Sequence, residues 1–136
     1  MRKKFFFGAG IVLLCLGVLG IYKIYQPHHN VEGEQTVGKF SAAALYNEFL
    51  HDENAANKKW AGKVIEVTGT ILSLAENGEH SSISLDAAPE GGINCGFLKR
   101  DLPSEAKLVK GEAITIKGKC TGFLMDVNLV DCVLIK

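Results

Sequence analysis

Histidines are the first residues of this chain to consider for catalysis or metal binding. They are His28, His29, His51 and His80. None has a cysteine or aspartate at a spacing typical of an activated nucleophile. The adjacent pair His28-His29 could ligate a metal, but a flexible polar stretch more often carries such residues solvated. We therefore predict no catalytic residue and no metal site among the histidines.

The cysteines are the second such group. Cys15 lies in the apolar N-terminal run, and Cys95, Cys120 and Cys132 lie further along the chain. No two of them form a CxxC motif, which argues against a zinc site or a thioredoxin-like redox motif. Two interpretations remain open: buried apolar thiols, or a disulfide in an oxidising compartment.

A disulfide would most simply join Cys120 and Cys132. These residues flank a predicted hairpin turn at Met125-Asp126. They face each other if a one-residue bulge, for which Gly122 is suited, shifts the register. Cys95 would then be the odd thiol, or an alternative partner through a neighbouring strand.

Other chemical motifs are missing from the sequence. It contains no GxSxG, no HExxH, no phosphate-binding glycine loop and no Rossmann fingerprint. We therefore expect a protein that is not an enzyme and that needs no cofactor.

The N-terminus predicts where the chain resides. Arg2, Lys3 and Lys4 precede an uncharged run of 18 residues, Phe5–Tyr22. As a helix this run would reach ~27 Å, close to the hydrocarbon thickness of a bilayer. The basic residues before it favour a cytoplasmic N-terminus. The sequence predicts an uncleaved, single-pass signal-anchor in the cell membrane, with the C-terminal part extracytoplasmic (periplasmic).

Two other fates of this segment are open. A cleaved signal peptide would normally have a shorter apolar region and a small-x-small cleavage site, for which Val18-Leu19-Gly20 is a weak candidate. A lipid-modified cysteine at Cys15 would require a small residue before it, and Leu14 is not small.

Composition divides the rest of the chain. Residues 1–25 form the predicted anchor, 26–39 a polar linker and 40–136 a single domain. The first 30 residues hold four of the 15 basic residues and no acid, so residues 31–136 carry 11 basic against 15 acidic residues, a net charge of −4. This balance does not favour binding to phosphates.

An amphipathic helix is predicted to open the domain. Ser41 is a good N-cap, and Leu45, Phe49 and Leu50 then repeat at helical spacing. Asp52 can cap a second short helix over 53–59. Trp60 follows, and we interpret it as a core lid rather than a ligand platform.

From residue 63 onward the pattern changes to strands. Alternating or β-branched runs predict strands at 64–74, 82–85, 93–97, 113–124 and 127–135, with an Asn-Gly turn at Asn77-Gly78 and a bulge or bend at Gly69. The longest break follows the third strand. This layout predicts a mainly β fold, a five-stranded OB-fold Greek-key barrel, with an SH3-like barrel as the nearest competitor. The expected core is Ile65, Val67, Ile83, Leu85, Ile114, Ile116 and Leu129, closed at one end by Leu45, Phe49 and Trp60.

The second and third strands are the usual ligand surface of such a barrel. We therefore predict a binding surface there. Its candidate residues are Ser82, Ser84 and Asn94 on the strands, with Lys99 and Arg100 at one end. An ordinary solvated sheet would have the same pattern.

Several short motifs, in this order, resemble the tRNA_anti-like family of bacterial envelope proteins. They are Pro27-His28, Val31, Leu45, Phe49, Asp52-Glu53, Ala56, Trp60, the run 62–69, Gly111, the run 118–122, Asp126-Val127, Leu129 and Cys132. The resemblance spans residues 27–136. It implies an OB-fold domain of the kind found in lipoproteins or single-pass membrane proteins, largely of Bacteroidetes-type bacteria. It implies no particular ligand.

These observations predict a function class. We expect a membrane-anchored, extracytoplasmic OB-fold module that binds an envelope protein or a glycan. The alternative is a nucleic-acid-binding OB-fold. Such proteins use a positive groove and displayed aromatic side chains, whereas the strands here offer only Phe97 and Phe123, both at expected core positions.

Overall fold

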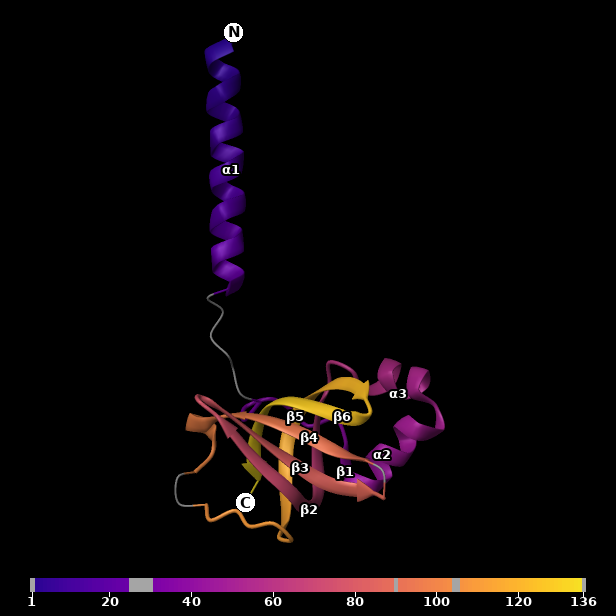
Figure 1. The fold of residues 1–136 in the computed structure, drawn as a ribbon. Coiled ribbons are helices and arrows are strands. Elements are labelled where there is room, and N and C mark those ends of the chain that lie inside the picture. The colour runs from indigo at the N-terminus through magenta and orange to yellow at the C-terminus, as the bar shows by residue number, and fades with distance from the viewer. Residues whose placement is uncertain (1, 25–30, 90, 104–105, 136) are drawn as a thin grey trace.

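The computed structural model describes residues 2–24, 31–89, 91–103 and 106–135 (Figure 1). The elements in chain order are α1 (Arg2–Ile24), β1 (Lys39–Ser41), α2 (Ala42–His51), α3 (Glu53–Trp60), β2 (Val64–Asn77), β3 (His80–Ala88), β4 (Gly91–Leu98), the 3-10 helix η1 (Lys99–Asp101), β5 (Ala113–Leu124) and β6 (Asp126–Ile135). The five predicted strands and the three predicted helical segments are confirmed as elements.

Helix α1 covers the apolar N-terminal run. Its described large apolar side chains, such as Leu13 and Leu14 at 72 % each, are exposed. Among the described residues, no helix combines the length and the apolarity needed to cross a bilayer.

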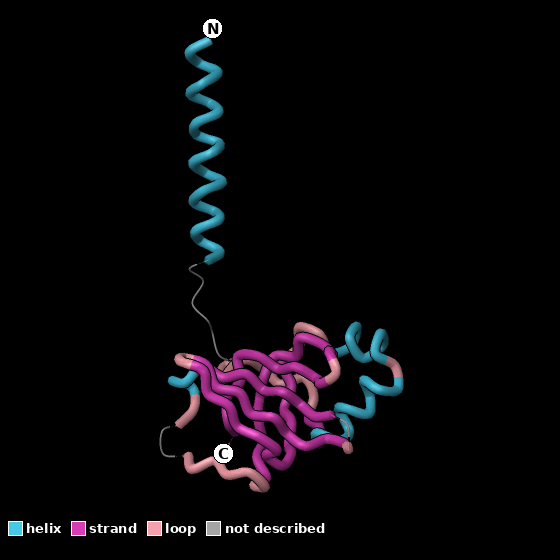
Figure 2. The backbone as a smooth tube through the Cα atoms, in the orientation of Figure 1, coloured by secondary structure: helices cyan, strands magenta, loops and turns pink. Residues whose placement is uncertain are grey.

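Five strands close into a barrel. The sheet order is β1-β2-β3-β4-β6-β5, and β2 also pairs with β5. Closure is possible because β2 is long enough to pair twice: residues 64–70 pair with β5, and 70–77 pair with β3. Figure 2 shows the strands wrapped around one another with α2 and α3 to one side. This closed five-strand arrangement is consistent with an OB-fold.

The two short helices begin where capping residues predict. The Ser41 side chain accepts a hydrogen bond from the backbone N–H of Ala44 at 3.2 Å, and Asp52 accepts one from Ala55 at 3.0 Å. Each bond satisfies an amide that the first helical turn leaves unpaired. Helix α2 buries Leu45 and Phe49, whereas Leu50 points away and is 56 % exposed.

The core follows the predicted alternation closely. All predicted barrel residues are buried except Ile114, which is half-buried against the same cluster. Trp60 is also half-buried: its ring meets Phe40 edge-on, with centroids 4.8 Å apart, and its Nε1 donates to Glu48 at 2.9 Å. The lid interpretation of Trp60 is consistent with this packing.

The predicted linker 26–39 ends earlier than expected. From Val31 onward the chain packs against the barrel: Val31 is 1 % exposed and its N–H donates to the Asp131 carbonyl at 3.2 Å. The buried Lys117 ammonium donates to the carbonyls of Glu32 and Glu34. Strand β1 then pairs in parallel with β2. The polar composition of this segment concealed these contacts, because they are made mostly by its backbone.

Of the two predictions for Gly69, a bulge or a bend, the bulge is wrong. Gly69 lies in the regular ladder with β5, and the bulge of β2 falls between Ile71 and Ser73 instead. A Cβ at position 69 would lie 2.8 Å from Cβ of Ala42. Glycine is therefore needed here for the close approach of α2 to the sheet.

Candidate ligand-binding pocket

Polar side chains line the outer face of β3 and β4. Ser84 lies opposite Asn94, and Ser82 lies opposite Gly96. Cross-strand partners share a face, so Ser82, Ser84 and Asn94 lie on one half-buried surface. Asn94 also lies opposite Asn128 of β6, and its Nδ2 donates to Oδ1 of Asn128 at 3.4 Å. The structure thus brings these three predicted residues together, and their role in binding stays a prediction.

The two basic candidates lie beyond the end of β4. Lys99 and Arg100 belong to η1, and both are exposed. The backbone N–H of Lys99 donates to the Glu79 carbonyl at 2.8 Å, which holds η1 beside the β2–β3 turn. Lys99 and Ser82 line the same cavity of about 390 Å³. Two of the predicted binding residues, Lys99 and Ser82, therefore lie at this cavity.

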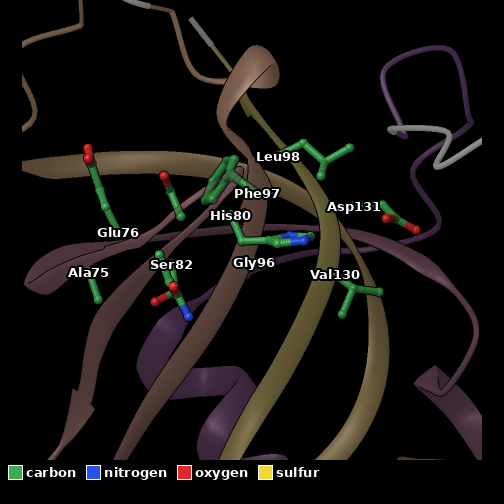
Figure 3. Close-up of a pocket in the computed structure, with 11 residues that line it drawn as sticks. Ala75, Glu76, His80, Ser82, Gly96, Phe97, Leu98, Val130 and Asp131 are labelled. Carbon is green, nitrogen blue, oxygen red and sulfur yellow. The ribbon is translucent and has the colours of Figure 1, made fainter.

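A second cavity, of about 350 Å³, opens where β4 and β6 separate (Figure 3). The ladder between these strands ends at the pair Cys95–Leu129. Beyond that pair, residues 96–98 of β4 and 130–131 of β6 line opposite sides of the space, and the ends of β2 and β3 complete it. His80 extends across it toward Val130 (Figure 3). We call this cavity the β4–β6 pocket.

The charge of the β4–β6 pocket is acidic. Glu76 and Asp131 contribute carboxylates, His80 contributes an imidazole, and neither Lys nor Arg is among the lining residues. Ser81, also in the lining, is 6 % exposed, and its Oγ has no hydrogen-bond partner among the described residues. An unpaired buried polar group costs about 1–3 kcal/mol. The pocket therefore favours ligands that donate hydrogen bonds or carry positive charge, and disfavours phosphates.

Sequence reasoning missed most of this pocket. His80 lies outside the strand predicted at 82–85, whereas in the structure it is the exposed first residue of β3. The sequence did contain one indication: His80 lies two residues before Ser82, and residues two apart on a strand share a face. Glu76 and Asp131 carried no local signal, because their proximity depends on how β4 and β6 separate.

The remaining histidines contribute no site that the structure describes. His51 ends α2 and is exposed, whereas His28 and His29 lie outside the described residues. Among the residues that are described, no three His, Cys, Asp or Glu side chains come together as metal ligands.

The register of the β5–β6 hairpin differs from the predicted one. Cys120 lies opposite Leu129, not opposite Cys132. Near Gly118 the strand β6 contains an extra residue, and Asp131 there adopts a positive φ of 53°. The turn pairs Leu124 with Asp126, and an extra residue of β5 between Cys120 and Gly122 then places Cys120 opposite Leu129, three positions from Cys132. The register on which a Cys120–Cys132 disulfide depended is therefore wrong, and both residues are buried free thiols.

A closed five-strand barrel of this strand order is the architecture of the OB-fold class. The chain belongs to the tRNA_anti-like family, whose model matches residues 1–134. The resemblance in the short motifs is thus confirmed over almost the whole chain. No curated protein matches the sequence.

Solved structures share the fold at low sequence identity. A lipoprotein of Klebsiella pneumoniae, named as a candidate nucleic acid-binding protein, has a TM-score of 0.60 and 16 % identity, over 71 % of this chain and 91 % of its own. A candidate aspartyl-tRNA synthetase of Leishmania major has a TM-score of 0.50 and 9 % identity, over 88 % of this chain but only 25 % of its own. At such identities the likeness establishes the fold alone.

Proposed function

We propose that this protein is a non-catalytic OB-fold binding module that is held at the cell membrane by residues 5–22. Its ligand would occupy the β4–β6 pocket and the adjoining polar surface of β3 and β4. The observation that carries the proposal is the pocket itself, which combines two carboxylates, a buried hydroxyl with no partner among the described residues, and the apolar side chains of Phe97 and Val130. Apolar walls with a few convergent polar groups are typical of ligand sites.

The ligand would be an envelope protein or a glycan. Both can present hydroxyl or ammonium donors to Glu76 and Asp131. The neighbouring surface adds the amides of Asn94 and Asn128 and the hydroxyls of Ser82 and Ser84, which can donate or accept. The net charge of −4 over residues 31–136 fits the same ligand class.

Nucleic acid is the second candidate ligand. The name of the Klebsiella lipoprotein favours it, as do the exposed basic side chains of Lys99 and Arg100. The acidic pocket opposes it. So does the polar face, because along the residues paired with Ser82 and Ser84 no described side chain is an aromatic on which a base could stack.

A paired substitution in the pocket tests the ligand site. We expect Glu76→Gln with Asp131→Asn to abolish capture of the envelope component that the wild-type full chain retains in a pull-down from its own envelope. Asparagine tolerates the positive φ of Asp131, so the fold should be kept. The matched control is Glu53→Gln on α3, which removes an exposed carboxylate at the other end of the barrel. Equal capture by the pocket variant would refute the site.

An oligonucleotide arm of the same assay separates the two candidates. A nucleic-acid binder loses affinity steeply as salt rises, because bound counterions are released. We expect the full chain to ignore single-stranded DNA and RNA at every salt concentration. Micromolar, salt-sensitive binding that is lost on neutralising Lys99 and Arg100 would replace the preferred ligand class with nucleic acid.

Orientation at the membrane has its own test. Arg2, Lys3 and Lys4 precede the uncharged run, which favours a cytoplasmic N-terminus and an extracytoplasmic C-terminus. A reporter that is active only in the cytoplasm, fused after Lys136, is expected to be silent, while the fusion pellets with membranes. An active reporter would show the reverse orientation. A mature N-terminus near Ile21 would show that the anchor is cleaved.

A further inference from the structure

Two cysteines meet inside the barrel, and they are not the pair that the hairpin suggested. Cys95 lies on β4 and Cys132 on β6, which are neighbouring strands, and both side chains are 0 % exposed in one core cluster. The Cys95 thiol is also close enough to contribute to the raised pKa of Cys132. The extra residue at Asp131 changes the alternation along β6, so that Cys132 and not Asp131 is fully buried in the barrel.

Glycine makes room for the Cys132 sulfur. A Cβ at position 118 would lie 2.5 Å from Sγ of Cys132, so glycine is the residue that fits beside this sulfur. Cys120 takes a different place, opposite Leu129. Cys120 therefore lies apart from Cys95 and Cys132.

We propose that Cys95 and Cys132 are an oxidation site, which a dithiol–disulfide oxidant converts to a disulfide joining β4 and β6. A thiolate of the pair attacks the oxidant disulfide and releases one thiol. The second cysteine then displaces the other thiol from the mixed disulfide. In total the protein loses two protons and two electrons, and the oxidant disulfide is reduced to two thiols. Small disulfides such as oxidised glutathione can serve, as can the disulfide of an oxidoreductase.

The bond would act on the β4–β6 pocket. Cys95 immediately precedes Gly96, and Cys132 immediately follows Asp131, and both of these neighbours line the pocket. The two strands separate just beyond the last ladder pair, Cys95–Leu129. A covalent link at this point would limit how far the pocket can open. Formation of the bond requires no bound ligand.

Access decides when the bond forms. Burial, and then the neighbouring Cys95 thiol and the Asp131 carboxylate, raise the pKa of Cys132 well above its usual range. The thiolate is the attacking species, so the folded dithiol should react slowly. We therefore expect efficient oxidation during folding, before the barrel closes.

The experiment refolds the full chain, carrying Cys15→Ser, from denaturant in detergent with reduced and oxidised glutathione. Free thiols are then alkylated in denaturant without reductant. Trypsin leaves Cys120 and Cys132 in one peptide, so a second cleavage before Asp126 is required. We expect a linked peptide that contains Cys95 and Cys132, together with alkylated Cys120. Three alkylated thiols, or any bond to Cys120, would overturn the proposal.

Variants supply the matched comparison. Cys120→Ser should keep the Cys95–Cys132 peptide at the wild-type yield, whereas Cys132→Ser should lose it completely. A Cys120→Ser chain that yields no linked peptide under conditions where it refolds would also overturn the pairing. If Cys132→Ser fails to fold, the peptide map of the Cys15→Ser chain still decides the outcome.

Discussion

Replacing Phe49 with alanine is expected to lower the free energy of unfolding by about 3–5 kcal/mol, through lost burial and the cavity left behind. Phe49 is 1 % exposed on the face of α2 that closes the barrel. Its ring stacks on Phe123 at a centroid distance of 5.9 Å, and Phe123 also contacts Tyr46 at 5.8 Å. The substitution therefore removes the centre of the contact between helix and barrel.

Chemical denaturation of the variant and the wild type measures this loss. The matched control is Leu50→Ala, which lies next along the same helix and is 56 % exposed. Because more than half of the Leu50 side chain is exposed, its replacement should change the free energy of unfolding by no more than about 0.5 kcal/mol. Similar unfolding midpoints for the two variants would contradict the placement of α2.

Replacing Gly92 with alanine is expected to lower the free energy of unfolding by about 3 kcal/mol. This is the upper end of the usual loss for an added methyl group in a packed core. A Cβ at this position would lie 2.4 Å from the Leu85 carbonyl oxygen. That oxygen belongs to the backbone of β3 and cannot turn aside as a side chain would. The Gly92 N–H also donates to Oδ1 of Asp126 at 2.8 Å, so β4 cannot shift without losing this bond.

A matched glycine elsewhere shows whether the effect is local. A Cβ at position 33 would meet no described atom within 4 Å, and Gly33 does not adopt a positive φ. Gly33→Ala should therefore be neutral or slightly stabilising, since alanine reduces the entropy of the unfolded chain. Thermal unfolding of both variants gives the comparison. A Gly92→Ala protein as stable as Gly33→Ala would show that the strands around Gly92 are placed differently.

Local patterns in the sequence were enough to predict most elements and most of the core. Ser41 and Asp52 cap helices through their own side chains, and Asn77-Gly78 turns because Gly78 adopts a φ of 61°. Alternation along the strands identified buried residues such as Ile65 and Ile83. These predictions succeeded because each depends on residues a few positions apart, whose preferences hold before any tertiary contact forms.

Packing between distant segments decided what those patterns could not. Val31 is buried because its side chain packs with Val64 of β2 and Val133 of β6, and Gly69 leaves room for the close approach of α2 to the sheet. Neither cause appears in the hydropathy of the surrounding residues. The same limit applied to Leu50, which fits a helical apolar stripe but points away from the barrel.

The sequence by itself determined a β-barrel domain that follows an apolar N-terminal helix, together with the polar face that carries Ser82, Ser84 and Asn94. Only the tertiary structure decided where a pocket opens on that face and which cysteines meet. Both outcomes depend on strand register. One extra residue at Asp131 changes which β6 residues face β4 and β5, and no local preference predicts where such a bulge will fall.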